Sequence, residues 1–83
     1  MANITVGVAA APVTGIDRNQ CLVIQNRGSV SIYWGYTASL TTANGVEILA
    51  GGAHEWPRPI VNFASAVYLI SGTAGQGVRW EHV

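Results

Sequence analysis

Charged residues are scarce in this chain, and lysine is absent altogether. Of the 83 residues, four are arginines and four are acidic, so the net charge is zero, whereas 49% are hydrophobic. Nucleic acids and anionic lipid surfaces are bound by concentrations of Lys and Arg, and this chain has no such concentration. So little charge would also leave a lone small domain poorly soluble. The composition argues against a nucleic-acid or membrane partner and favours a surface that is buried against other protein chains.

Cysteine is nearly absent as well, because Cys21 stands alone. A single cysteine excludes an internal disulfide, and no group of Cys and His has the spacing of zinc ligands, so we expect no metal and no other cofactor. A folded monomer of 8.7 kDa would bury only about 62% of the surface that its unfolded chain exposes, which leaves a thin core. Small domains are usually stabilised by a disulfide, a metal or oligomerisation. With the first two excluded, a homo-oligomer is expected.

The chain also lacks long hydrophobic runs and helical periodicity. No stretch approaches the ~18 consecutive apolar residues of a membrane span. The apolar beginning, residues 1–11, has no basic residue and is interrupted by polar ones, so we expect neither a signal peptide nor a membrane anchor there. No window of about 11 residues places apolar side chains at helical spacing. These absences leave an all-β fold.

What is present is an alternation of apolar and polar residues with a period of two, interrupted by Gly, Asn and Pro. Strands are predicted after the first segment at residues 21–25, 30–36, 46–50, 54–56, 66–71 and 78–83. We expect the first two of these to form one hairpin and the last two another, and we expect Asn44-Gly45 to form a tight turn with positive φ angles. About 6–8 short strands predict a small antiparallel β-sandwich or barrel.

The first segment carries an apolar stripe of its own. Ile4, Val6 and Val8 alternate with polar or small residues, and Pro12 and Gly15 separate the stripe from the rest of the chain. The stripe is either an N-terminal arm, which adds a strand to a neighbouring chain, or an ordinary first strand of its own sheet. We therefore divide the chain into residues 1–17, an arm or first strand with its linker, and one β domain of residues 18–83.

The residues that most often carry chemistry are few and scattered. Cys21 begins an aliphatic run, where a thiol behaves as a small hydrophobic side chain, so we expect it to be buried and unreactive. His54 and Glu55 are adjacent, and neighbours on a strand point to opposite faces and cannot share a metal ion. His82 would need a coincidence in space to join His54. The single aspartate, Asp17, is expected to pair locally with the arginine that follows it. We predict no catalytic residue and a non-enzymatic protein.

Aromatic side chains remain as candidates for binding. Trp34 and Tyr68 alternate with small or polar neighbours and are expected in the core. Trp56 lies beside Pro57 and Arg58 in a loop-like segment, so we predict that Trp56 is exposed and that Trp56 and Arg58 belong to an interface with protein rather than carbohydrate. The predicted interface residues, with the first-segment stripe included, are Ile4, Val6, Val8, Trp56 and Arg58.

Several short motifs resemble those of small virion proteins of tailed bacteriophages. They are an L-x-I-x-N-x-G strand at residues 22–28, a T-x-x-N-G loop at residues 41–45 and a terminal Y-x-I strand that begins at Tyr68. The likeness spans residues 18–81. It implies a capsid decoration, or cement, protein: a small β-rich protein, usually a homotrimer, that sits on the outside of the head and bridges subunits of the major capsid protein.

The resemblance implies no cofactor and no catalysis, and it transfers no catalytic residue. The matching positions are turn glycines, asparagines and aliphatic residues of the core. A protein bridging several capsid subunits would oppose the outward pressure of packaged DNA, and contacts made by several copies at once would add up. The alternative is a tail, neck or fibre component that binds a receptor or a glycan.

Overall fold

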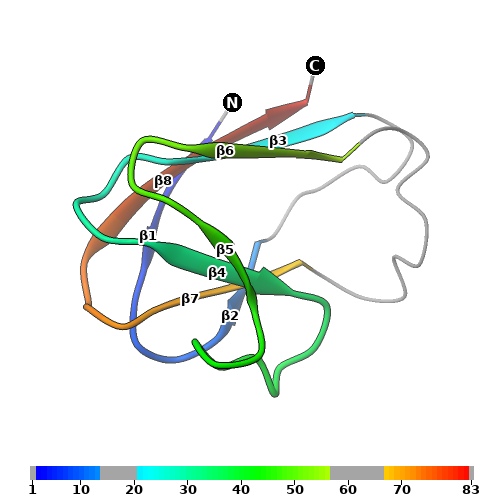
Figure 1. Cartoon of the computed structure of the whole chain (residues 1–83). Coiled ribbons are helices and arrows are strands. Elements are labelled where there is room, and N and C mark those ends of the chain that lie inside the picture. The colour runs from blue at the N-terminus through cyan, green and yellow to red at the C-terminus, as the bar shows by residue number, and fades with distance from the viewer. Residues whose placement is uncertain (1, 14–20, 57–66, 83) are drawn as a thin grey trace.

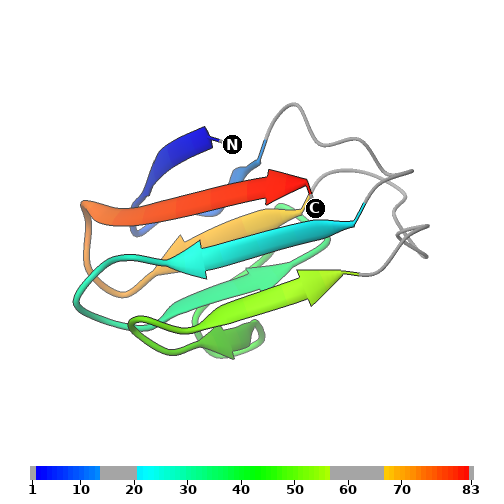
Figure 2. The same ribbon diagram turned by 90° about the horizontal axis from the view of Figure 1, so that it is seen from above.

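The structure is a computed structural model, and it describes residues 2–13, 21–56 and 67–82. These residues form two antiparallel sheets of four strands each, packed face to face (Figures 1 and 2). The predicted all-β fold of short strands is confirmed, and it is a sandwich. The described residues include no helix that could cross a membrane.

The order of the strands defines the two sheets. The first sheet contains β1 (Ala2–Val6), β8 (Gln76–His82), β3 (Leu22–Asn26) and β6 (Ala53–Trp56), in that order. The second sheet contains β2 (Ala11–Pro12), β7 (Tyr68–Ser71), β4 (Ile32–Gly35) and β5 (Val46–Ile48), in that order. Each sheet turns one face to the other sheet and one face outward, which matches the alternation of the sequence.

Most connections between consecutive strands run from one sheet to the other. Of the described strands, only β4 and β5 are both consecutive in sequence and neighbours in a sheet. The two hairpins predicted from residues 21–36 and 66–83 are therefore wrong, because β3 and β8 belong to the first sheet whereas β4 and β7 belong to the second. When a turn crosses from one sheet to the other, the apolar faces of the two strands that it connects can meet in the core.

Residues 2–6 are integrated into the domain. β1 pairs along its full length with β8, with Ile4 opposite Val78. The chain then crosses to the second sheet, where β2 pairs with β7 and Pro12 lies on the edge, a position that tolerates proline. Of the two alternatives for the first segment, the first strand of the domain's own sheet is therefore the one observed. Residues 14–17 of the predicted linker lie outside the described residues.

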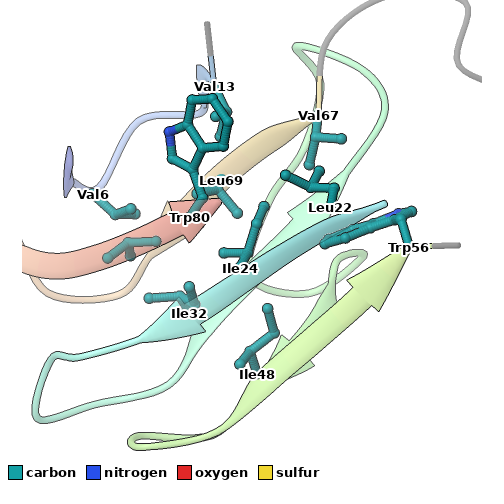
Figure 3. Packing of buried hydrophobic residues seen from close by; sticks show 11 residues of the cluster. Val6, Val13, Leu22, Ile24, Ile32, Ile48, Trp56, Val67, Leu69 and Trp80 are labelled. Atoms are coloured by element: carbon teal, nitrogen blue, oxygen red, sulfur yellow. The ribbon is translucent and has the colours of Figure 1, made fainter. Parts of the chain in front are cut away.

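The core lies between the sheets and is formed by their inward side chains (Figure 3). In β3, Leu22 and Ile24 are fully buried, and they meet Ile32 of β4 and Leu69 of β7, which are equally buried. Burying an aliphatic side chain of this size stabilises the fold by about 1.5–3 kcal/mol. In β3 and β8, buried side chains alternate with outward ones, and the buried side chains hold the two sheets together.

The loop between β4 and β5 covers part of the outer face of the second sheet. Leu40, in this loop, is buried, and Gly35 and Gly45 leave it room. A Cβ atom on Gly45 would come within 2.7 Å of the Cβ of Tyr33 and 2.8 Å of a methyl carbon of Leu40. Glycine is therefore needed here for space.

The same loop corrects the turn predicted at Asn44-Gly45. The described glycines with positive φ are Gly51 and Gly75, so Gly45 does not have the predicted conformation. The loop is instead closed by Thr41, whose backbone N–H donates to Oδ1 of Asn44 at 2.8 Å and whose carbonyl accepts from the N–H of Gly45 at 3.0 Å.

Candidate functional site

The structure places four of the five predicted interface residues. Val6 and Trp56 belong to the core, with exposed fractions of 3% and 5%, and Ile4 is half-buried against it. Val8, in the loop after β1, is 62% exposed. Arg58 lies outside the described residues. Of the four described residues, only Val8 is largely exposed in the chain.

The prediction that Trp56 is exposed is wrong. Trp56 is the last residue of β6, and it shares the inner face with His54 because the two are separated by one residue. Its indole Nε1 donates a hydrogen bond to the hydroxyl oxygen of Tyr36 at 3.0 Å. The proline that follows in sequence has no bearing on the direction in which the preceding strand residue points.

Four aromatic rings gather on the inner side of the sandwich at this end of β6. We call Trp34, Tyr36, His54 and Trp56 the aromatic cluster. The ring centroids of Trp34 and Trp56 lie 4.8 Å apart and those of His54 and Trp56 lie 4.4 Å apart, both in edge-to-face geometry, which is favoured for aromatic pairs. The rings pack against one another, so this cluster contributes mainly to packing between the sheets.

Two polar groups of the aromatic cluster are affected by burial. Desolvation lowers the pKa of His54 below its usual value of 6.5, which favours the neutral imidazole. The indole Nε1 of Trp34 is buried and has no hydrogen-bond partner among the described residues.

Trp34 and Tyr68 were both expected in the core. Trp34 is half-buried against the core, whereas Tyr68 points to the outer face of the second sheet and is not a core residue.

Cys21 and His82 meet at the same end of the sandwich. Cys21 precedes β3 and is half-buried, so the predicted full burial is wrong. Nδ1 of His82 lies 3.2 Å from the backbone carbonyl oxygen of Cys21, and this contact does not involve the thiol. In the part of the chain that the structure describes, no group of three or more His, Cys, Asp and Glu side chains could hold a metal ion.

The outer face of the first sheet is exposed, and all four strands contribute to it. We call it the first-sheet face. Its residues, all exposed or half-buried, are Asn3, Thr5, Val23, Gln25, Ala53, Glu55, Gly77, Arg79 and Glu81. Three of them are charged, and the others are small, apolar or neutral polar residues. A protein that covers this face would have to provide partners for two glutamates and one arginine.

The pairing of strands fixes the pattern on the first-sheet face. Val23 lies at the centre, with Glu55 of β6 on one side and Glu81 of β8 on the other. An open hollow lies along this row, and Val23 and Glu81 are among the residues that line it. A second hollow lies over Gly77, with Arg27 at its rim. This face could not be predicted from the sequence, because it depends on which strands are neighbours in the sheet.

The outer face of the second sheet offers a different surface. A hollow there is lined by the hydroxyl-bearing side chains of Ser31, Tyr33, Thr42 and Thr73. We call it the hydroxyl hollow. An aromatic ring among hydroxyl groups can stack on a sugar and exchange hydrogen bonds with it. The hydroxyl hollow is therefore where a glycan would fit best on the described surface.

At the end of the sandwich opposite the aromatic cluster, two buried amide side chains bind the turns together. Asn26 is fully buried. Its Nδ2 donates to the carbonyl oxygens of Val30, at 2.8 Å, and Ile48, at 3.0 Å, and its Oδ1 accepts from the N–H of Gly28 at 2.9 Å. The backbone of Asn26 also bonds to Gly51 and Gly52 of the turn between β5 and β6. Asn26 thus joins two turns and the second sheet.

Gln76 acts in the same way from the start of β8. Its Oε1 accepts from the backbone N–H groups of Ser29, at 2.9 Å, and Val30, at 3.2 Å, and its Nε2 donates to the carbonyl of Ala74. Gly28 packs so closely against the Gln76 side chain that a Cβ there would collide with it. We call Asn26 and Gln76 the amide clamp. From the sequence, Asn26 is one position of the L-x-I-x-N-x-G motif, and nothing there marks Gln76.

Comparison with models of protein families, with curated proteins and with solved structures finds no match to this chain. The resemblance to phage virion proteins therefore rests on its short motifs alone. In the structure, Leu22, Ile24 and Asn26 of the first motif are buried, and Thr41 and Gly45 of the second motif close a loop. These motif residues thus have places in the core and in a loop.

Proposed function

We propose that this chain is a non-enzymatic structural protein of a tailed-bacteriophage particle, which decorates the outside of the capsid and stabilises it by bridging major-capsid subunits. The first-sheet face is the observation that carries the proposal. It is formed by all four strands, six of its nine residues are uncharged, and its three charged side chains include both signs. The motif resemblance supports the assignment to a virion.

The area available fits this role. The accessible surface of the chain is 4568 Å², and a stable protein interface takes about 800 Å² from each partner, which is roughly a sixth of that surface. A chain that also associates with its own copies would present several such faces to the shell at once, and the contacts would then add through effective concentration.

Binding to particles tests the proposal. The variant Val23→Lys places a charge at the centre of the first-sheet face, and Ala43→Lys places the same charge on the exposed loop between β4 and β5 as a control. Incubated with capsids of the encoding phage that lack the protein, the wild type and Ala43→Lys should co-sediment with the shells, and Val23→Lys should bind at least about tenfold more weakly. Electron microscopy of the decorated shells should show the protein on their outside.

Two results would contradict the proposal. If the wild type does not bind these shells, the capsid role is wrong. If Val23→Lys binds as well as Ala43→Lys, the first-sheet face is not the contact.

The hydroxyl hollow favours a second candidate function, a tail, neck or fibre component that binds a glycan. In that case a glycan array should give specific binding that Tyr33→Ala abolishes and Val23→Lys leaves unchanged. The two substitutions lie on opposite sheets, so the two functions are separated by one pair of variants.

A further inference from the structure

The four strands at the edges of the sheets differ in how they are protected from pairing with other chains. β2 has two residues, one of which is Pro12, and β5 has three residues, one of which is the exposed Glu47. β6 contains Glu55 and is followed in sequence by Pro57. Short length, charge and proline are the devices by which edge strands avoid association.

β1 has none of these devices. It has five residues, Ala2–Val6, without a charge or a proline. It pairs with β8 on one side, and no described residue pairs with its other side (Figure 2). Backbone N–H and C=O groups on that free side are a template for another strand.

The side chains of β1 fit a copy of the same strand. Asn3 and Thr5 point to the first-sheet face, where both are exposed, and Ile4 points inward, where it is half-buried. An antiparallel pair of identical strands is self-complementary, since each strand presents both donors and acceptors. If the pair is centred on Ile4, Asn3 of each copy lies opposite Thr5 of the other, and no charge meets a like charge.

We propose that β1 pairs in antiparallel fashion with β1 of a second copy of this chain, centred on Ile4, so that two first sheets join into one continuous sheet. The contact covers the half-buried Ile4 of each copy with that of the other and satisfies the free backbone edge of both. It relates the copies by a two-fold axis. It therefore predicts an even-numbered assembly, either a dimer or two joined trimers of the kind that the resemblance implies. The inference does not depend on the capsid role.

Sedimentation of the purified full chain tests the contact. Thr5→Lys places a charge on the free edge strand opposite Gly77 of β8, where there is open space around the glycine. Ala53→Lys places the same charge on the other edge strand of the same sheet, and Thr5→Ser keeps the hydroxyl. We expect an even-numbered assembly for the wild type, Thr5→Ser and Ala53→Lys, and a dissociation constant raised at least about tenfold for Thr5→Lys. Matching melting curves would show that the variants are folded.

A wild type that stays at the monomer mass of 8.7 kDa up to about millimolar concentration would overturn the proposal, as would an odd-numbered assembly. Equal dissociation by Thr5→Lys and Ala53→Lys would also overturn it, because the contact would then lie on the first-sheet face.

Hydrogen exchange of the wild type provides a measurement that does not depend on any variant. In an isolated chain, the β1 amides that point away from β8 exchange quickly. They should become protected as the protein concentration rises, whereas the amides of β6 should not. Unchanged exchange in β1 under conditions where sedimentation shows association would place the contact elsewhere.

Discussion

The two ends of the sandwich are held together by different chemistry. At one end the amide clamp, Asn26 and Gln76, joins three turns through hydrogen bonds to backbone atoms. At the other end the aromatic cluster packs ring against ring, with one hydrogen bond from Trp56 to Tyr36. A bond to a fixed backbone group needs one kind of side chain in one place, whereas apolar packing can be satisfied by several combinations. Loss of a hydrogen-bonding group should therefore cost more at the amide clamp than in the aromatic cluster.

The largest effect is expected from Asn26→Ala. This change leaves the carbonyl groups of Val30 and Ile48 and the N–H of Gly28 without their partner in a buried site, which should lower the free energy of unfolding by about 3 kcal/mol or more. Urea denaturation measures the loss. Gln25→Ala, one residue earlier and on the first-sheet face, is the control and should cost about 0.5 kcal/mol or less. Equal losses of unfolding free energy for the two variants would show that the Asn26 side chain of the amide clamp makes no special contribution to stability.

A smaller effect is expected at the other end. Tyr36→Phe removes the acceptor of the Trp56 indole N–H and should lower the free energy of unfolding by about 1 kcal/mol. Trp56→Phe and the double variant complete a double-mutant cycle by urea denaturation. The loss from Tyr36→Phe should be reduced when residue 56 is already phenylalanine, since the donor is then gone. Strict additivity would show that the hydrogen bond contributes nothing to stability.

The smallest effect is a dependence on pH. Burial lowers the pKa of His54 in the folded chain below 6.5, so the unfolded chain binds more protons as the pH falls through this range, and the folded state loses stability below about pH 6.5. Thermal melts at about pH 7.5 and pH 5 should differ more for the wild type than for His54→Gln. His82→Gln is the matched histidine control. A pH dependence that survives in His54→Gln and disappears in His82→Gln would contradict the prediction, because the effect would then come from a residue outside the aromatic cluster.

The direction of side chains within a strand could be predicted from the sequence, because it depends on the backbone alone. Alternation in residues 30–36 places Ile32 and Trp34 on one face, and the structure buries Ile32 in the core and packs Trp34 against it. The connection that follows β3 could not be predicted. A short turn with Asn and Gly is compatible with a hairpin or with a crossing between sheets, and the crossing is fixed by the bond from Asn26 to Ile48, which is distant in sequence.

The candidate site was harder to predict for the same reason. Exposure of Trp56 depends on what lies opposite β6, and the partner of its indole, Tyr36, comes from the other sheet. The first-sheet face can be recognised only when β3 is known to lie between β6 and β8. This order places Glu55 and Glu81 on either side of Val23. Individual strand patterns contain no information about this order.

The pairing of β1 with β8 affects how the chain can fold while it is synthesised on the ribosome. β1 is synthesised well before β8, the strand with which it pairs, whereas β3 can pair with β6 before β8 is made. Among the described strands, β4 and β5 are the paired strands closest in sequence. Contacts between segments so distant in sequence as β1 and β8 form slowly. A nascent chain stalled before residue 76 would therefore leave β1 without its partner strand and expose its apolar stripe.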